Sequence, residues 1–217
     1  AGSGKSTCLR CIILLELPSS GAFSIAGEAI KSNPPKNGEM HPADRKQIQR
    51  LRTDLAMVFQ SFNLWGHMNV LQNVMEAPVQ VLGQSKAEAR EKAEAMLQRG
   101  GLYEKRDQFP AFLSGGQQQR AASARALAIE PRAMLFDEPT SALDPELVGE
   151  VLKVIRSISD EGRTMILVTH EMAFARDVSS KIMYLHQGLV EEEGSPDQAF
   201  KNPTSERTRA FVSSIHN

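Results

Sequence analysis

The sequence predicts an α/β fold in which helices cover both faces of a mostly parallel sheet. Four short apolar runs alternate with segments of helical periodicity along the 217 residues, and these runs cover 55–59, 133–136, 165–169 and 182–185. Continuous apolar runs of this length are typical of parallel strands buried on both faces. A polar residue capable of chemistry follows three of the runs directly, as expected at the carboxyl edge of such a sheet. The composition, 41% hydrophobic and 24% charged, fits one globular domain.

Three helices and one further strand are predicted in the first hundred residues. The first helix is mostly apolar and ends at Pro18, and the third begins with a capping box formed by Ser85 and Glu88. The helices are predicted over 6–17, 44–52 and 85–99, the strand over 23–25, and a loop over 31–42.

The second half of the chain continues the alternation of helices and strands. Helix-forming residues cover 121–129, and another helix begins at Asp144, an N-cap residue followed by Pro145. After the fourth apolar run, a turn at Gln187–Gly188 predicts an antiparallel partner strand over 189–192. Two short helices are expected to close the chain.

The first residues carry a motif for phosphate binding, which consists of Gly2, Ser3, Gly4, Lys5, Ser6 and Thr7. Glycines let backbone N–H groups approach phosphate oxygens, and the N-terminus of the following helix adds partial positive charge. In this pattern Lys5 reaches the β- and γ-phosphates and Ser6 ligates Mg²⁺. The alternative is a chance sequence in a surface loop. The first glycine of the pattern and its strand would precede Ala1, so the chain is expected to be N-terminally truncated and impaired in ATP hydrolysis.

Four polar residues are predicted to meet at the carboxyl edge of the sheet: Gln60, Asp137, Glu138 and His170. Each has a simpler interpretation, Gln60 as a turn residue, Asp137 as a cap and His170 as a polar strand end. Together they suit phosphoanhydride hydrolysis, which needs positioning and charge neutralisation. Asp137 would hold Mg²⁺, Glu138 would orient or deprotonate the attacking water, and His170 would contact the γ-phosphate. Gln60 could join the metal shell.

A second candidate phosphate site consists of Ser114, Gly115, Gly116 and Gln117. Ser114 and Gln117 also fit a capping box, which is the purely structural interpretation. However, two glycines in the first turn of a helix cost about 1 kcal/mol each relative to alanine. That cost is reasonable if the backbone must approach an anion closely, so this helix start is a candidate for phosphate binding.

Charge and composition argue against several other classes of function. The net charge is −1, and the mixing of acids and bases leaves no basic tract for nucleic acid. No apolar run is long enough to span a bilayer, and we expect no signal peptide before the first motif. Cys8 and Cys11 are spaced for redox or metal chemistry, but we expect them to lie on a buried helix face. A reducing cytoplasm fits this composition.

The ordered motifs resemble the ATP-binding subunit of ABC transporters across almost the whole chain. These motifs are Gly4-Lys5-Ser6-Thr7, Gln60, Leu113–Gln117, Glu138, Ser141-Ala142-Leu143-Asp144 and His170. Further stretches resemble the importers of polar amino acids, in particular those for histidine, lysine, arginine and ornithine or for the opines octopine and nopaline. They cover residues 57–65, 73–78, 144–152 and 185–188.

The resemblance implies a P-loop NTPase fold that binds ATP and Mg²⁺, the metal being held by Ser6, Gln60 and Asp137. It implies a helical subdomain over about 68–130 inserted in a RecA-like core, and a C-terminal hairpin with helices over about 186–217.

It also implies an ATPase dimer, expected to be a homodimer, in which Ser114–Gln117 of one copy close over ATP held by the other and Asp144 belongs to the D-loop. Integral membrane permease subunits would contact Gln60–Trp65, with a substrate-binding protein acting indirectly and no nucleic acid involved. The expected location is peripheral, at the cytoplasmic face of the inner membrane.

Two other hypotheses remain at this stage, a non-transport ABC ATPase and a remnant without catalytic activity. The chain also departs from the family pattern in ways that bear on folding. The family's adenine-stacking aromatic would precede Ala1, and Ile13 stands where an asparagine is expected. Ser123 replaces an aliphatic residue, and Gly100–Gly101 is unusual before Leu102.

Overall fold

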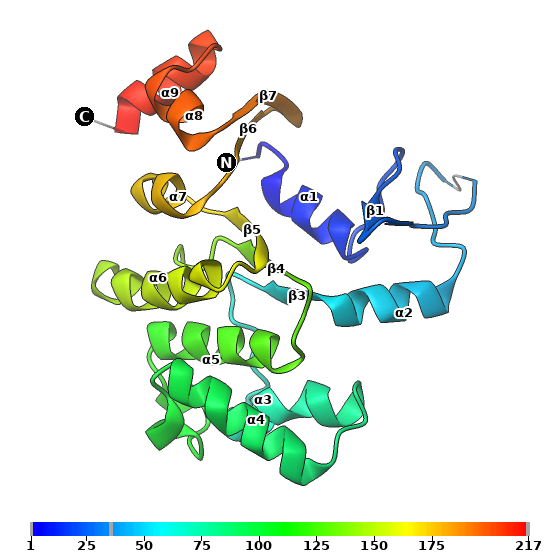
Figure 1. Cartoon of the computed structure of the whole chain (residues 1–217), viewed down its shortest axis with the longest axis vertical. Coiled ribbons are helices and arrows are strands. Elements are labelled where there is room, and N and C mark those ends of the chain that lie inside the picture. The colour runs from blue at the N-terminus through cyan, green and yellow to red at the C-terminus, as the bar shows by residue number, and fades with distance from the viewer. Residues whose placement is uncertain (1, 35–36, 216–217) are drawn as a thin grey trace.

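A computed structural model describes residues 2–34 and 37–215 (Figure 1). Its centre is a parallel sheet of three strands in the order β3 (Leu55–Val58), β4 (Ala133–Asp137) and β5 (Thr164–Val168). Leu55 lies beside Ala133, and Ala133 beside Thr164, so the three strands start in register. Their carboxyl ends therefore form one edge, as the sequence predicts.

The strands β3 and β4 are covered on both faces, in agreement with their continuous apolar sequence. Because side chains alternate along a strand, Leu55 and Leu135 pack toward α1 (Lys5–Ile12) in a cluster with Leu9. The intervening residues pack on the opposite side against α5 (Gly115–Ala128) and α6 (Pro145–Asp160). This larger cluster comprises Ala56, Val58, Ala122, Ala126, Leu127, Met134, Phe136, Val151, Ile155, Ile158 and Phe174.

The strand β5 is more exposed than its apolar sequence predicts. In the described part of the chain it pairs only with β4, so it forms an edge of the sheet. Ile166 at its centre is 42% exposed. The expectation that residues 165–169 form a fully buried strand is therefore wrong. The helix α1 packs on Leu135, but the neighbouring Ile166 on the same face is not part of that apolar cluster, so this face of β5 is uncovered at Ile166.

The run 182–185 was expected to be a fourth buried strand of the parallel sheet, and this is also wrong. It forms β6 (Ile182–His186), which pairs with β7 (Leu189–Gly194) in a separate antiparallel hairpin. Positive φ at Gln187 (49°) and Gly188 (80°) makes the tight turn between them, and this geometry matches the twist of a hairpin. The predicted turn and antiparallel partner are confirmed. The helices α7 (Met172–Val178), α8 (Pro196–Lys201) and α9 (Glu206–Ile215) flank the hairpin in the sequence.

The first helix is shorter than predicted, since α1 ends at Ile12 rather than Leu17. Leu14 adopts φ 55°, which a right-handed helix excludes. The Arg52 guanidinium donates to the carbonyls of Ile13 and Leu14 and so satisfies the end of the helix. Cys8 is exposed and Cys11 half-buried, both as free thiols, so the expectation of a buried pair is wrong.

Between α1 and β3 the chain forms a small outlying unit (Figure 1). It consists of the short antiparallel pair β1 (Ser24–Ile25) and β2 (Glu28–Ala29), followed by α2 (Arg45–Asp54). Asp44 caps α2 by accepting from two backbone N–H groups. Pro35 and Lys36 of the predicted loop lie outside the described residues, as do His216 and Asn217 of the predicted C-terminal segment.

Three helices pack together below the sheet in Figure 1: α3 (Val70–Gln80), α4 (Lys86–Arg99) and α5. The capping box of Ser85 and Glu88 is confirmed at the start of α4. Short 3₁₀ turns at Tyr103–Lys105 and Pro110–Phe112 lead into α5. The helices share an apolar cluster of Val70, Leu71, Val74, Ala93, Leu97, Leu102, Leu113, Ala121, Ala124 and Ala128. Within the described ranges, no helix is both long and apolar enough to cross a bilayer.

Candidate functional site

The phosphate-type loop enters α1 in the backbone conformation that its glycines allow. Gly2 and Gly4 adopt φ 82° and 83°, a region that side chains disfavour. Gly4 is the N-cap of α1 and provides no side-chain cap, so the first N–H groups of the helix stay available for an anion. Lys5 Nζ donates to Ser3 Oγ over 3.0 Å. The loop therefore presents backbone donors and one ammonium group at a single helix start.

Ser6 and Asp137 meet although 131 residues separate them in the sequence. The Ser6 hydroxyl donates to Asp137 Oδ1 over 2.6 Å, and Asp137 is buried at the end of β4. Arg10 Nη2 lies 3.8 Å from Asp137 Oδ2. Arg10 was not predicted, but it stands four residues after Ser6 and hence on the same helix face. A hydroxyl beside a carboxylate suits a hard cation such as Mg²⁺, so these two residues fit the metal that the resemblance implies.

Glu138 and His170 also come together at the sheet edge. Glu138 Oε1 lies 3.1 Å from His170 Nε2, and the His170 side chain is 62% exposed. Glu138 adopts φ 47°, an unfavourable conformation for a non-glycine residue. It is held there because its N–H donates to the Val168 carbonyl and its own carbonyl accepts from Ser141. The backbone thus directs this carboxylate toward His170.

Gln60 follows β3 at the same edge, but its side chain is exposed and makes no hydrogen bond within the described ranges. The structure therefore does not bring Gln60 into contact with Ser6 or Asp137, and its place in a metal shell stays a prediction. Residues 61–65 turn back toward α5. Phe62 is half-buried, whereas Trp65 is 40% exposed.

Two side chains that the sequence did not single out for a role hold this segment. Asn73 on α3 is fully buried and bonds to the N–H and the carbonyl of Trp65. Arg125 on α5 donates to the carbonyls of Phe62 and Asn63, and burial lowers the pKa of its guanidinium. Arg125 lies more than sixty residues after its partners in the sequence, whereas Asn73 lies eight residues after Trp65. A polar Asn73 among the apolar residues of α3 was the one signal that could have pointed to such a role.

The turn at Ser114 has the capping-box geometry. Gln117 N–H donates to Ser114 Oγ, and Gln117 Oε1 accepts from Ser114 N–H. The structure also gives the glycines a packing reason. A Cβ on Gly115 would lie 3.1 Å from Leu143 Cδ2, and a Cβ on Gly116 would lie 3.1 Å from Leu147 Cβ. The helix start thus packs tightly on the chain around α6, and its proposed role toward an anion stays a prediction.

Asp144 stands at the N-cap position of α6, as expected, but its side chain makes no cap hydrogen bond. The carboxylate is exposed. Asp144 is therefore free to contact another molecule.

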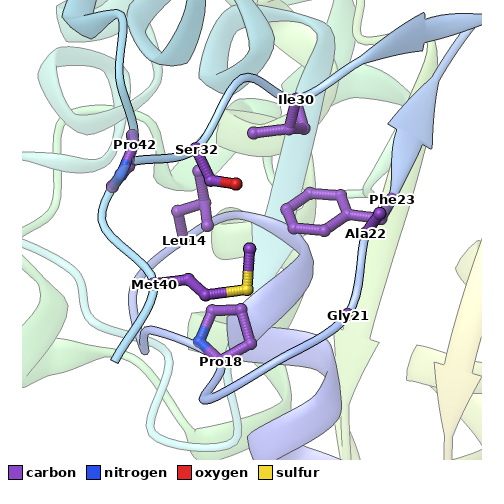
Figure 2. A pocket seen from close by; sticks show the side chains of 9 residues that line it. All are labelled: Leu14, Pro18, Gly21, Ala22, Phe23, Ile30, Ser32, Met40 and Pro42. Carbon is purple, nitrogen blue, oxygen red and sulfur yellow. The ribbon is translucent and has the colours of Figure 1, made fainter. Parts of the chain in front are cut away.

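The apolar hollow in Figure 2 lies away from these residues. It encloses about 300 Å³ of space open to solvent and follows the C-terminal end of α1, whereas the phosphate-type loop stands at the opposite end. Side chains of Leu14, Phe23, Ile30 and Met40 surround it. In the part of the chain that the structure describes, no group of three or more His, Cys, Asp or Glu residues is placed to hold a metal ion. A metal here would need the Ser6 hydroxyl as well as Asp137.

A sequence profile of the family described as "ABC transporter" matches residues 1–141. The chain belongs to the ABC transporter family.

Individual members of the ABC transporter family are similar over almost the whole chain. The arginine/ornithine transport ATP-binding protein AotP of Pseudomonas aeruginosa is 59% identical over 213 residues, which are 98% of this chain and 84% of AotP. The nopaline permease ATP-binding protein P of Agrobacterium fabrum is 58% identical over 215 residues, 99% of this chain and 84% of that protein.

A solved structure, the dimeric post-hydrolysis state of the ATP-binding cassette MJ0796 bound to ADP and Pi, superposes with a TM-score of 0.73. It is 33% identical, and the match covers 89% of this chain and 81% of that one. The resemblance to the family and the predicted fold class are thereby confirmed. The roles of single residues and the division into domains stay predictions.

Proposed function

We propose that the chain is the ATP-hydrolysing subunit of an ABC importer that energises uptake of a basic amino acid or an opine. The observation that carries this proposal is the identity of 58–59% to the transport subunits AotP and nopaline permease protein P over at least 98% of the chain. The geometry at the sheet edge supports hydrolysis by the same protein.

The ATP phosphates bind to the loop formed by Gly2, Ser3, Gly4, Lys5, Ser6 and Thr7, with Lys5 as the point charge. Ser6 and Asp137 hold Mg²⁺, which neutralises phosphate charge when bound, and Gln60 completes its shell. Arg10 lies close enough to Asp137 to keep the buried carboxylate in place before the metal arrives.

Glu138 orients the attacking water and accepts its proton, since its carboxylate is only partly solvated and lies at the end of β4 beside Asp137. His170 contacts Glu138 and is exposed enough to turn toward the γ-phosphate. Positioning of this kind is the main contribution a protein makes to phosphoryl transfer.

Two copies of the chain form the working unit. Ser114, Gly115, Gly116 and Gln117 of one copy close over the ATP of the other, and Asp144 joins that interface. The fold divides into a core and a helical subdomain over about 68–130, followed by the C-terminal segment over about 186–217. Membrane permease subunits contact Gln60–Trp65 from the cytoplasmic face, and a substrate-binding protein delivers the solute to them.

A chimera in which this chain replaces the matching 84% of AotP tests the transport function. We expect it to restore uptake of labelled arginine in P. aeruginosa cells that lack AotP. A chimera that is expressed and soluble but gives no uptake would contradict the assignment as an importer subunit.

Glu138→Gln in the same chimera tests the hydrolytic site. The amide keeps the shape but cannot accept a proton, so ATP turnover should fall by about 10²–10⁴ while ATP binding is retained. Glu146→Gln, at an exposed position on the first turn of α6, is the matched control and should leave turnover unchanged. Near-normal turnover in Glu138→Gln would remove Glu138 from its role.

A further inference from the structure

One cation from a distant helix binds two successive carbonyls of the segment that follows Gln60. Arg125 Nη1 donates to the Asn63 carbonyl over 2.6 Å, and Nη2 donates to the Phe62 carbonyl over 3.1 Å. The two donors of one planar guanidinium therefore bind two successive carbonyls. A lysine ammonium cannot reproduce this fork.

The carbonyls that Arg125 binds belong to an unfavourable stretch of backbone. Phe62 and Asn63 adopt φ 58° and 52°, two consecutive left-handed residues without a glycine. Such residues persist only where the surrounding structure compensates for them. Asn63 N–H donates locally to the Ser61 carbonyl. The hydrogen bonds from Arg125 instead connect Phe62 and Asn63 to another element of the fold.

The same guanidinium also covers the indole of Trp65. Its carbon lies 5.0 Å from the centre of the ring, within the range of a cation–π contact. Arg125 itself is half-buried. It thus contacts three of the four residues from Phe62 to Trp65.

This segment is in turn packed on the start of α5. A Cβ added to Gly115 would lie 3.7 Å from Phe62 Cζ and 3.1 Å from Leu143 Cδ2. The segment after Gln60, the turn at Ser114 and the stretch before Asp144 therefore meet around one glycine. A displacement of the Phe62 ring would therefore change the packing of all three segments.

We propose that Arg125 is a positioning residue that fixes the segment 61–65 to α5, so that this segment moves with the helix beginning at Ser114. We call the contacts of Arg125 with Phe62, Asn63 and Trp65 the clamp, and it depends only on contacts within the chain. Its consequence for hydrolysis rests on the proposed function, because that function places Gln60 at the nucleotide.

The first experiment uses Trp65, the sole tryptophan of the chain, as a reporter. In the full chain without nucleotide, Arg125→Lys should shift the Trp65 emission and raise its quenching by acrylamide, because the ring loses its cover. The matched control is Arg156→Lys, whose guanidinium lies 5.6 Å from the centre of the Phe174 ring on another part of the fold. It should change neither signal. An Arg125→Lys chain that is folded by circular dichroism but keeps the emission and quenching of the unchanged chain would overturn the clamp.

The second experiment needs no substitution and therefore remains decisive if Arg125→Lys does not fold. Hydrogen exchange of the unchanged chain should show the hydrogen-bonded amides of Phe62, Asn63 and Trp65 protected and opening together with α5. Exchange at the rate of a free loop would overturn the proposal.

The consequence for hydrolysis is measured separately in the AotP chimera. Arg125→Lys should lower kcat for ATP while leaving KM within about twofold, since a mispositioned Gln60 affects turnover rather than phosphate binding. A rise in KM alone, with the tryptophan signals changed as expected, would keep the clamp but overturn its link to Gln60. An inactive unsubstituted chimera would instead count against the proposed function.

Discussion

Asn73→Ala should destabilise the protein and release the segment before α3. Asn73 is fully buried, and its side chain makes four hydrogen bonds to backbone. Its Oδ1 accepts from Trp65 N–H over 2.8 Å, and its Nδ2 donates to the carbonyls of Trp65, Met68 and Asn69 over 3.0–3.1 Å. One amide therefore ties the whole turn to the helix.

The expected loss in the free energy of unfolding depends on which backbone groups keep another hydrogen-bond partner in Asn73→Ala. The Trp65 carbonyl still accepts from Met68 N–H, and the Asn69 carbonyl still accepts from Asn73 N–H. The Trp65 N–H and the Met68 carbonyl have no other partner in the described ranges. Stranding a buried donor costs about 1–3 kcal/mol, and the acceptor adds to it, so we expect a loss of about 2–4 kcal/mol.

Urea unfolding followed by Trp65 emission and by circular dichroism measures this loss. Asn69→Ala is the control, because Asn69 caps α3 from a more exposed position and its loss should cost only about 1 kcal/mol. In Asn73→Ala the tryptophan signal should also change at lower urea than the helical signal. A loss below about 1 kcal/mol, or no larger than that of the control, would refute the assignment of Asn73 as the main support of this turn.

Two further predictions concern pH and pairing of the subunits. Burial acts to raise the pKa of Glu192, but hydrogen bonds from Thr204 and Ser205 outweigh it and lower that pKa overall. The pKa of Glu192 is thus lower in the folded chain than in the unfolded chain. The ionised carboxylate therefore stabilises the fold above the unfolded glutamate pKa, and this stabilisation is lost as the pH falls through the folded pKa. Glu192→Gln should therefore flatten the acid side of the stability–pH curve measured by thermal unfolding, and an unchanged curve would contradict this. Gly116→Asp should prevent ATP-driven pairing of two chimera molecules in light scattering, whereas Gly116→Ala, which meets the same 3.1 Å contact with Leu147 Cβ, should not. Equal loss in both would indicate a packing role only.

The parts of the fold that the sequence predicted well depend on local pattern. The strands β3 and β4 coincide with apolar runs, and Glu138 and His170 meet because parallel strands end at one edge. The helix α3 was missed because Pro78 lies inside it and Asn69 rather than serine begins its capping box.

Other features could not be predicted because they depend on partners far away in the sequence. Arg125 reaches carbonyls more than sixty residues before it, and nothing in its own helix distinguishes it from an exposed cation. The glycines at 115 and 116 suggested an anion, while the structure shows that packing alone against Leu143 and Leu147 also requires small residues. The two glycines alone therefore could not distinguish an anion site from a packing requirement.

The edge of β5 leads to the last prediction, which concerns ATP binding. On its outer side β5 has no strand partner in the described residues, and Ile166 is left 42% exposed. The Ser6–Asp137 hydrogen bond ties the start of α1 to the sheet, and a Cβ added to Gly4 would lie 3.8 Å from Gly188 Cα. A loop binds phosphate well only when its N–H groups are held convergent before the ligand arrives.

Support of the phosphate-type loop by other parts of the protein as well as by α1 should therefore strengthen its binding of ATP. Fixing the backbone of one residue costs about 1–2 kcal/mol, so ordering one or two loop residues on binding corresponds to roughly a 10–100-fold loss of affinity. We expect the 217-residue chain to bind ATP more weakly by about this factor than the AotP chimera, which also contains the part of AotP that the match does not cover. Isothermal titration of both proteins with a non-hydrolysable ATP analogue measures the difference. Equal affinities would mean that α1 alone organises the loop, and the exposed edge of β5 would then have no bearing on nucleotide binding.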